Sequence, residues 1–558
     1  MNDQIVDVLV VGSGAGALTA AVTAANHGAK VLVVEKSKLF GGTSAMSGGG
    51  VWVPNNSNAK KLGQNDSFEE ALLYMTSMIG DQVKLSRLET YVKRAPEMLD
   101  YLQTHTHLKM EAYPYPDYYS DAPGAKEGYR TQAPRVFRGS KLGDDLYKMQ
   151  PQAPGSLVQG KFSLTFKEAR KFLTQDKGWR ATLFKMLFSY YADIPGRMKG
   201  KLSRRLTQGH SLVGSLFLSV KEQGVDVWLD SPMKSLLHEN GVVTGAMVER
   251  GGDEIEVHAS NVILAAGGFE HNENLRHSTL PKPTHQDWSV SQDANTGDAI
   301  VAAGELNAAT DLMNHAWWIP VVKVPGWSRA IGIFAERSLP GLVIVNKHGK
   351  RIGNEADPYL ESGYAMYRAD SIPSWVIFDS RFRKKYPFGP LGPGWATPDK
   401  FINKKVKAIW AREDTLEDLA ATLKIDAYGL RHTIERNNIF AETGVDEDFQ
   451  RGSSFYDRYY GDHHNKPNPC IAPISEPPFY ALPLHPGDIG TKGGLLTNDN
   501  AQVLNTSGEV IEGLYACGNT SAAVMGDKYL GAGATLGPAM TFGYLAALHA
   551  TQHERRAS

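Results

Sequence analysis

The chain has 558 residues, 42% of them hydrophobic and 21% charged, with a formal net charge of −1 at pH 7. This length predicts two or more folding units, and the balanced charge excludes the basic footprint of a nucleic-acid-binding protein. The two cysteines, Cys470 and Cys517, form no CxxC pattern, so the sequence predicts neither a disulfide framework nor a structural zinc or iron–sulfur site.

A glycine-rich pattern opens the chain. The apolar run 7–11 leads into the segment 12–17 (GSGAGA), and a second apolar run, 31–34, ends at Glu35. Glycines let a backbone approach a pyrophosphate closely, and the N-terminus of the following helix offers unpaired N–H groups and a favourable dipole. A carboxylate about 20 residues further on can bind a ribose 2′-hydroxyl and would repel the 2′-phosphate of NADP. The segment therefore predicts a β–α–β unit that binds a dinucleotide.

A second glycine-rich segment, 41–50, follows the acid directly and carries several hydroxyl groups. Such a loop suits a long ligand whose pyrophosphate and flavin need further backbone N–H donors. Far along the chain, two hydrophobic strands run into small residues at 262–268 and 513–519, which lets the backbone pass close to a planar ring. Three such elements, spread from one end of the chain to the other, predict one FAD-binding domain assembled from distant segments.

The expected fold class is α/β, with a Rossmann-like FAD-binding domain and an inserted α+β catalytic domain. The first part of the FAD-binding domain is predicted over 1–275, where apolar residues at helical spacing occupy 66–105. A proline-rich mixture of strand and helix patterns over 276–482 predicts the catalytic or substrate domain, and 483–558 completes the FAD-binding domain.

One segment within an extension at 130–205 is strongly basic. Between residues 161 and 205, twelve basic residues stand against three acidic ones, and they flank the apolar run 179–191. This run is too short to span a bilayer, but basic flanks on an aromatic and aliphatic helix suit an interfacial anchor on anionic lipid, where each cation contributes about 1 kcal/mol. A core helix with a solvated basic rim, or an oligomer contact, is the alternative.

The absence of a signal peptide and of a spanning helix predicts an intracellular protein. Together with the basic segment, this places the expected location in the cytoplasm, as a peripheral protein on the cytoplasmic face of the inner membrane.

Several residues have side chains suited to chemistry. Tyr529 precedes a glycine-rich turn that opens a helix, so its phenol and the backbone N–H of Gly533 could converge on one carbonyl oxygen. Such paired donors matter most when that oxygen gains negative charge. A core tyrosine beside a flavin loop fits the same pattern, and Tyr118 and Tyr359, taken singly, fit structural roles. The pair His463-His464 lacks a carboxylate at supporting spacing, so no metal site is predicted.

Longer stretches carry a family resemblance; they are Phe40–Ala45, Asp117–Tyr119, Asn295–Ala299, Glu336–Gly341, Gly490–Leu495 and Gly537–Phe542. In them the chain resembles the 3-ketosteroid Δ1-dehydrogenases (3-oxosteroid 1-dehydrogenases), a branch of the fumarate reductase/succinate dehydrogenase flavoprotein superfamily. The resemblance covers nearly all of the chain and is weakest over 130–205, an extension found in longer members. It implies an FAD-dependent enzyme that forms a C1–C2 double bond in a 3-ketosteroid.

The resemblance also implies four catalytic roles. Tyr529 and the backbone N–H of Gly533 correspond to the pair that binds the steroid C3 carbonyl. Tyr359 corresponds to the base that removes a C2 proton, after which flavin N5 takes hydride from C1. Tyr118 corresponds to the tyrosine that assists this base, with the adjacent Tyr119 as the alternative. Because a free phenol has a pKa of about 10, a hydrogen bond from the assisting phenol is expected to lower it.

The predicted FAD-binding residues come from all the glycine-rich segments. They are Gly12, Ser13, Gly14, Ala15, Gly16, Ala17, Glu35, Lys36, Gly41, Gly42, Thr43, Ser44, Ala266, Gly267, Gly518, Asn519 and Leu536.

Two alternative activities stay open. A related flavoenzyme that desaturates C4–C5 of the same ketone would need the same fold and carbonyl clamp. Fumarate reductase-like chemistry would need cations that clamp two carboxylates, for which Arg337 and Arg351 are available. The sequence does not specify the steroid side chain, the oligomeric state or the electron acceptor, although an interfacial helix favours a quinone.

Overall fold

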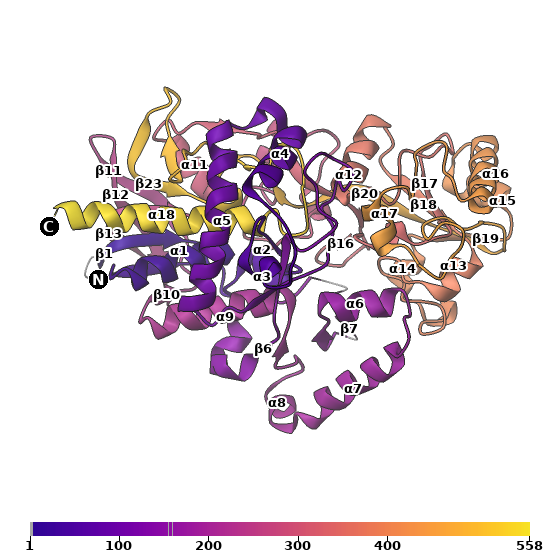
Figure 1. Cartoon of the computed structure of the whole chain (residues 1–558), viewed down its shortest axis with the longest axis horizontal. Coiled ribbons are helices and arrows are strands. Elements are labelled where there is room, and N and C mark those ends of the chain that lie inside the picture. The colour runs from indigo at the N-terminus through magenta and orange to yellow at the C-terminus, as the bar shows by residue number, and fades with distance from the viewer. Residues whose placement is uncertain (1–3, 154–155, 159, 558) are drawn as a thin grey trace.

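The structure, a computed structural model, describes residues 4–153, 156–158 and 160–557. Two sheets, each covered by helices, lie at opposite ends of the molecule, and both chain ends lie beside the first sheet (Figure 1). The first sheet follows the order β10-β2-β1-β13-β12-β11, and β23 pairs with both β13 and β22. Its strands are β1 (Gln4–Val11), β2 (Val31–Val34), β10 (Asp226–Trp228), β11 (Met233–Glu239), β12 (Val242–Arg250), β13 (Asp253–Leu264), β22 (Gln502–Leu504) and β23 (Val510–Ala516).

The parallel half of this sheet consists of β10, β2, β1, β13 and β23. All four residues of β2 are buried, as expected of a parallel strand with helices on both faces. The helices of this body are α1 (Ala15–Asn26), α2 (Gly42–Met46), α3 (Ser57–Lys60), α4 (Phe68–Ile79), α5 (Leu85–His105), α9 (Gln208–Glu222), α10 (Glu273–Thr279), α11 (Asp298–Gly304) and α18 (Leu536–Ala557).

Helices α1 and α18 pack closely although they come from opposite ends of the chain. Glycines at the contact make this possible: a Cβ on Gly16 would lie 2.8 Å from the carbonyl oxygen of Ala539, and one on Gly543 would lie 2.5 Å from that of Gly16. The first and last segments of the chain therefore share one core, as the distant FAD-binding segments predicted.

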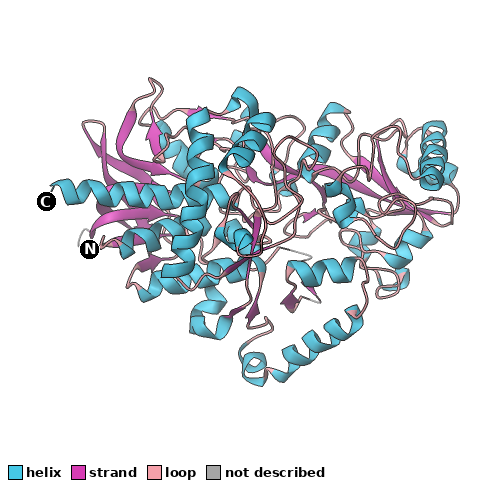
Figure 2. Ribbon diagram, viewed as in Figure 1, coloured by secondary structure: helices cyan, strands magenta, loops and turns pink. Residues whose placement is uncertain are grey.

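The second sheet follows the order β16-β15-β20-β18-β17, with β19 beside β20. Its strands are drawn in magenta on the right of Figure 2. Its strands are β15 (Ala316–Val322), β16 (Ile331–Gly332), β17 (Leu342–Val345), β18 (Ser374–Phe378), β19 (Ala411–Glu413) and β20 (Phe479–Thr491). Its helices are α12 (Tyr359–Arg368), α13 (Ser380–Lys385), α14 (Lys404–Lys407), α15 (Leu416–Leu423), α16 (Ala427–Thr443) and α17 (Phe455–Tyr460). β20 crosses the boundary predicted at 482 and leads the chain back toward the first body.

The remaining elements are the helices of the basic extension and several short strands. Three helices of the basic extension, α6 (Phe166–Leu173), α7 (Trp179–Ala192) and α8 (Ile194–Lys199), form a protruding arm below them in Figure 1. The short strands are β3 (Val51–Trp52), β4 (Met110–Ala112), β5 (Thr131–Pro134), β6 (Phe137–Arg138), β7 (Leu157–Val158), β8 (Phe162–Ser163), β9 (Arg205–Leu206), β14 (Thr310–Asp311) and β21 (Gly494–Leu495). Within the described residues, no helix has the length and apolar character that crossing a membrane requires.

Candidate active site

A cavity of about 500 Å³ is lined by both bodies. The carboxyl end of β1, the segment 42–50, the end of β13 and the start of α18 contribute from the first body. The second body contributes the segment 330–336, Tyr359 and α17 residues. Ligands of open α/β sheets bind at the carboxyl ends of the strands, which is where this cavity lies.

The turn between β1 and α1 needs glycine for two reasons. Gly12 has a φ of +112°, and a Cβ there would lie 2.3 Å from the carbonyl oxygen of Ala265, at the end of the neighbouring strand β13. Gly14 is the N-cap of α1 and has no side chain that could cap the helix; the N–H of Ala15 donates to Ser44 Oγ at 3.0 Å, and the first turn of α1 lines the cavity. This is a cradle for a phosphate group.

Glu35 lies beside this turn and is buried. Its carboxylate accepts hydrogen bonds from Ser13 Oγ at 2.5 Å and from the backbone N–H of Ser37 at 2.8 Å, and its pKa is raised by burial. The next residue, Lys36, also lines the cavity, and its Nζ donates to Asp298 Oδ2 at 2.6 Å. The carboxylate and its serine partner therefore both line the cavity, at the position where the sequence predicts that a ribose binds.

The structure gathers nearly all the predicted cofactor residues on this cavity. Those that line it are Gly12, Ser13, Gly14, Ala15, Gly16, Ala17, Glu35, Lys36, Gly42, Thr43, Ser44, Ala266, Gly267, Gly518, Asn519 and Leu536. Gly41 is not among the lining residues; its backbone N–H instead donates to Ser13 Oγ at 2.9 Å, and its φ of +104° caps α2. We call this lining the cofactor wall.

Three phenols meet on the opposite side of the cavity. Tyr118 Oη lies 3.4 Å from Tyr359 Oη, and the ring of Tyr529 lies 5.3 Å from that of Tyr359 and 5.1 Å from that of Tyr118, measured between centroids. All three are buried. They come from the loop after β4, the first residue of α12 and the loop before α18, and we call them the phenol cluster.

Backbone pairing sets the position of two of these phenols. The N–H of Tyr118 donates to the carbonyl of Leu530 at 2.9 Å, which holds Tyr118 next to Tyr529. Gly533 has a φ of +95°, and a Cβ there would lie 2.3 Å from the carbonyl oxygen of Gly50. A hydrogen bond from the Gly533 backbone lowers the pKa of Tyr529 in part, against a larger rise from burial. The two donors predicted to converge on one carbonyl oxygen therefore lie together.

Burial controls the acidity of the phenol cluster. It raises the pKa of Tyr118 and Tyr359 well above the ordinary phenol range, and the neighbouring phenols add to this rise. The expected lowering of the Tyr359 pKa by an assisting phenol is therefore wrong for this state, because burial raises this pKa and the contacts with Tyr118 and Tyr529 raise it further. Tyr359 is a neutral phenol here.

Tyr119, the alternative to Tyr118, points elsewhere. Its hydroxyl donates to Glu361 Oε1 at 2.8 Å, and it does not line the cavity. Of the two adjacent tyrosines, Tyr118 is the one that contacts Tyr359.

Two residues beside Tyr529 were missed by sequence reasoning. The ring of Trp317 lies 4.9 Å from that of Tyr529, and Lys492 Nζ lies 3.8 Å from the Trp317 ring. Lys492 is fully buried, donates to the carbonyls of Gly526 and Lys528, and has its pKa lowered well below the usual lysine range by burial. Its only signal was its place in the stretch 490–495, where a lysine stands among glycines.

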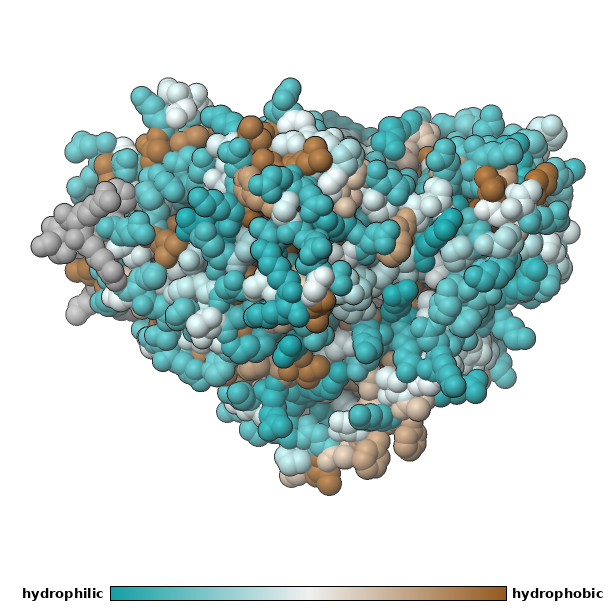
Figure 3. Space-filling view, viewed as in Figure 1, coloured by the Kyte–Doolittle hydropathy of each residue, from teal (hydrophilic) through white to brown (hydrophobic). Residues whose placement is uncertain are grey.

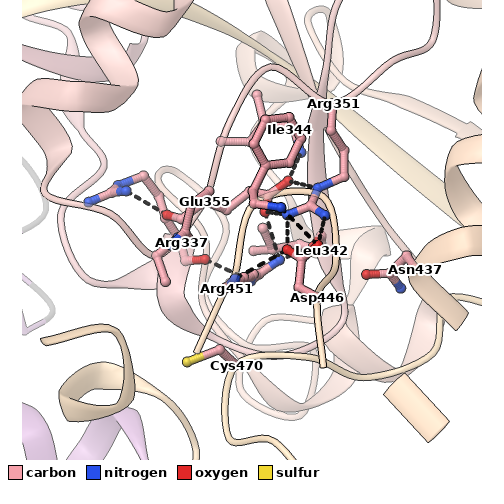
Figure 4. A network of polar contacts seen from close by, with 12 residues as sticks. Arg337, Leu342, Ile344, Arg351, Glu355, Asn437, Asp446, Arg451 and Cys470 are labelled. Atoms are coloured by element: carbon pink, nitrogen blue, oxygen red, sulfur yellow. Dashed lines mark hydrogen bonds and ion pairs between the residues drawn. The ribbon is translucent and has the colours of Figure 1, made fainter. Parts of the chain in front are cut away.

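The two arginines available for carboxylate binding are committed elsewhere. Arg337 donates to the carbonyls of Glu355 and Asp357 at 2.6 and 2.8 Å. Arg351 pairs with Glu355 at 2.7 Å and with Asp446 at 2.8 Å, in the network of Figure 4. Neither lines the cavity. Among the described residues that do, Lys36 is the only cation, and Asp298 neutralises it.

Comparisons with known proteins agree with this geometry. The family model described as FAD binding domain matches residues 7–536. The chain is 41% identical to the 3-oxosteroid 1-dehydrogenase of Mycobacterium tuberculosis, over 98% of this chain and 99% of that protein. It is 35% identical to 4-oxocyclohexanecarboxylate 2-dehydrogenase of Sinomonas cyclohexanicum, over 97% and 92%.

A solved structure extends the likeness to three dimensions. The crystal structure of 3-ketosteroid delta1-dehydrogenase from Sterolibacterium denitrificans, in complex with 1,4-androstadiene-3,17-dione, matches with a TM-score of 0.95 and 46% identity, covering 99% of this chain and 100% of that one.

The glycine cradle, the buried acid and the family model define an FAD-binding flavoprotein with an α/β fold, which confirms the expected fold class and cofactor. Within that class, the chain belongs to the 3-oxosteroid 1-dehydrogenase family of oxidoreductases, as the resemblance implied.

Proposed function

We propose that the protein oxidises a 3-ketosteroid to the 1,2-unsaturated ketone through the residues of the phenol cluster. The observation that carries the proposal is the meeting of Tyr118, Tyr359 and Tyr529 with the Gly533 backbone in one buried cavity. FAD, when bound, supplies the acceptor for the hydride that leaves C1.

Each residue has a role in enolisation. Tyr529 and the N–H of Gly533 donate to the C3 carbonyl oxygen and stabilise the negative charge that develops there; loss of one such donor costs about 3–4 kcal/mol in known enzymes. Tyr359 releases its phenolic proton to solvent when the ketone binds, and the resulting phenolate accepts the C2 proton, which this charge stabilisation makes acidic. Tyr118 donates to Tyr359 and holds its oxygen toward C2. Because burial raises the pKa of Tyr359, its phenolate forms only together with the bound ketone.

The charge of the cavity favours a neutral polycyclic substrate over an acid. The Sinomonas relative is named for a ring ketone that carries a carboxylate, and fumarate carries two. In this chain, the paired Lys36 is the single cation among the described residues of the lining. Around the phenol cluster the lining is aromatic, with Phe334, Tyr456 and Tyr460. A steroid nucleus fits this surface, and its apolar faces gain from burial.

Anaerobic titration of the purified holoenzyme with a 3-keto-4-ene steroid tests the proposal. We expect the flavin absorbance to bleach and a 1,4-diene-3-ketone to form. A second assay uses a saturated 5α-ketosteroid as the substrate. If its product carries a C4–C5 double bond instead of a C1–C2 double bond, the result would support the alternative desaturase. An unchanged flavin with every 3-ketosteroid would overturn the steroid assignment.

We further propose that the arm at 161–205 binds an anionic membrane surface and delivers electrons to a quinone there. α7 is apolar on two faces: Met186 and Tyr190 pack against Phe162, while Phe184 and Phe188 are 72% and 67% exposed. Met198 on α8 is 85% exposed. Brown and tan atoms gather at this protruding tip in Figure 3, and the segment 161–205 carries twelve basic residues. Exposed aromatics with basic neighbours are typical of interfacial anchors.

Sedimentation with vesicles tests the membrane proposal. We expect the wild type to bind vesicles that contain phosphatidylglycerol and to be released by high salt. The double substitution F184S/F188S should abolish binding, whereas F401S, at a residue 70% exposed on the other body, should not. Equal binding by the wild type and both variants, or no binding by the wild type, would contradict the membrane role and leave the dehydrogenase assignment untouched.

A further inference from the structure

A cluster of metal-ligating side chains lies outside the cavity, where the basic arm meets the second body. Asp176, in the turn between α6 and α7, lies beside His463 and His464, in the loop after α17. Asp176 Oδ1 is 3.3 Å from His463 Nε2 and 3.7 Å from His464 Nε2, and the three ligand atoms all lie within 4.8 Å of one another. The sequence offered no carboxylate at supporting spacing from the histidine pair; the fold supplies one from almost 300 residues away.

The geometry resembles a set of ligands more than an ion pair. Asp176 Oδ1 is buried and has no hydrogen-bond partner, although two imidazole nitrogens lie within 4 Å of it. Asp176 Oδ1 therefore lies close to both imidazoles without a hydrogen bond to either. Ligand atoms placed 2.0–2.1 Å from a tetrahedral Zn²⁺ lie about 3.3–3.4 Å apart, close to the two separations found here.

Both halves of the cluster are held by the same residue of the second body. Gln175 Nε2, next to Asp176, donates to the carbonyl of Lys385 at 2.9 Å. Asp462, next to His463, is fully buried and accepts from Lys385 Nζ and from Tyr386 Oη, and its other oxygen accepts from the His464 N–H at 2.9 Å. Ligands that are fixed in this way lose little freedom when a metal binds.

We infer that Asp176, His463 and His464 bind a Zn²⁺ ion or a similar borderline divalent cation. Two imidazoles and one carboxylate are the ligand types that such ions prefer. The histidines are 53% and 57% exposed, so a water molecule can occupy the fourth position and the ion can enter from solvent. The site goes beyond the dehydrogenase function and does not depend on it.

The ion would connect two helices that line the steroid cavity. Phe166 and Ala169 of α6 line the cavity, as do Tyr456 and Tyr460 of α17. Asp176 follows α6 and the histidines follow α17, so a bound cation would fix these two helices relative to each other. The expected consequence is a more stable arm. The ion itself takes no part in the dehydrogenation.

Equilibrium dialysis of the tag-free holoenzyme against ZnCl2 tests the site. We expect one Zn²⁺ per chain that D176N and the double variant H463N/H464N each weaken by at least roughly tenfold, since the loss of even a supporting contact costs 10–100-fold. The matched control is H277N/H285N. These exposed histidines also flank a carboxylate, Glu273, at 3.3 and 3.5 Å, but do not form a three-ligand group.

X-ray absorption at the zinc edge of the loaded wild type should fit imidazole nitrogen and carboxylate oxygen at about 2.0–2.1 Å. Zinc should also raise the melting temperature of the wild type and of the control, but not of D176N. Equal zinc affinity in the wild type and D176N, or loss of binding only in H277N/H285N, would overturn the inference. FAD content and steroid turnover, measured on the same samples, establish that each variant is folded and keep this outcome separate from that of the proposed function.

Discussion

The cofactor wall and the phenol cluster, which both line the cavity, are built from different kinds of chemical group. The cofactor wall is largely backbone: Gly12 and Gly14 have no side chains and let the turn after β1 approach the cavity, and small residues from distant segments complete the wall. The phenol cluster is side chain: three hydroxyl groups come from two loops and the first residue of α12 and meet in a buried space. The cofactor wall depends on glycines that leave space free of side chains. The phenol cluster depends on hydroxyl groups that are placed where water is excluded.

The difference predicts how each wall fails. A substitution on the cofactor wall should add atoms where none fit and so remove FAD from the protein. A substitution in the phenol cluster should leave FAD and the fold in place and remove the reaction. The predictions below test this separation, beginning with the largest effect.

Gly12→Ala should yield protein that does not retain FAD. The new Cβ would lie 2.3 Å from the carbonyl oxygen of Ala265, a contact that only a shift of the strand end could relieve. The measurement is the flavin absorbance per chain after gel filtration. Gly28→Ala is the matched control: its φ of +91° is equally unfavourable, but nothing lies within 4 Å. We expect it to cost about 1–2 kcal/mol of stability and to keep FAD. Equal loss of FAD from both would attribute the effect to backbone strain instead.

Tyr359→Phe should retain FAD and bind steroid, while turnover falls about 10²–10⁴-fold, the usual contribution of a general base. The measurement is the rate of flavin bleaching in an anaerobic stopped-flow experiment, with steroid affinity from the spectral shift of the flavin. Tyr428→Phe, at a residue 76% exposed, should change neither. Near-normal bleaching in Tyr359→Phe would remove this residue from the proton transfer.

Tyr118→Phe should lower the same rate by roughly tenfold, since one hydrogen bond contributes about 0.5–1.5 kcal/mol. Tyr119→Phe is its natural control because Tyr119 bonds to Glu361 rather than to Tyr359. If Tyr119→Phe were the slower variant, the assisting role would move to the neighbouring residue.

Lys492→Met tests a residue that lies behind the phenol cluster. Methionine needs no desolvation of a cation, which offsets the loss of the two hydrogen bonds to the carbonyls of Gly526 and Lys528, so the melting temperature should change little. Turnover should fall by less than in Tyr359→Phe, because Trp317 loses the cation that holds it against Tyr529. A melting temperature that falls together with turnover would mean that Lys492 acts on the fold alone.

A smaller effect concerns stability against pH. Asp357 lies two residues before Tyr359, and its pKa is raised to about 7, first by burial and then by the charge of Asp457. The folded protein therefore holds this proton in a range where the unfolded chain, with a pKa near 3.8, has released it. The contribution of Asp357 to stability should fall as pH rises from about 4 to about 7 and stay low above that. Asp357→Asn should remove this slope, which melting curves from pH 5 to pH 8 would reveal.

The same contrast explains what could be predicted from the sequence. The cofactor wall was readable because a glycine turn, a helix start and Glu35 follow one another within a few tens of residues. The phenol cluster was not, since Tyr118 and Tyr359 are 241 residues apart and no periodicity links them. Only the family resemblance predicted that these two tyrosines belong to one site. Lys492 and the partnership of Asp176 with His463 had no local signal, because each depends on packing between segments that are remote in sequence.

The domain boundary illustrates the same limit. A composition change indicated 482, but β20 continues from Phe479 to Thr491 because it serves as a central strand of the second sheet and then as the return path to the first. Hydrogen bonding to β15 and β18, not local composition, determines where this element ends.

The packing of α1 against α18 has a consequence for synthesis of the chain. Gly16 leaves the ribosome early, but the helix that it contacts contains Gly543, near the other end. At roughly 5–20 residues per second, the nascent chain waits about half a minute to two minutes before its first helix finds its native neighbour. FAD capture is therefore a late event in the life of the polypeptide, and a message truncated before the last helix would yield a protein unable to close around its cofactor.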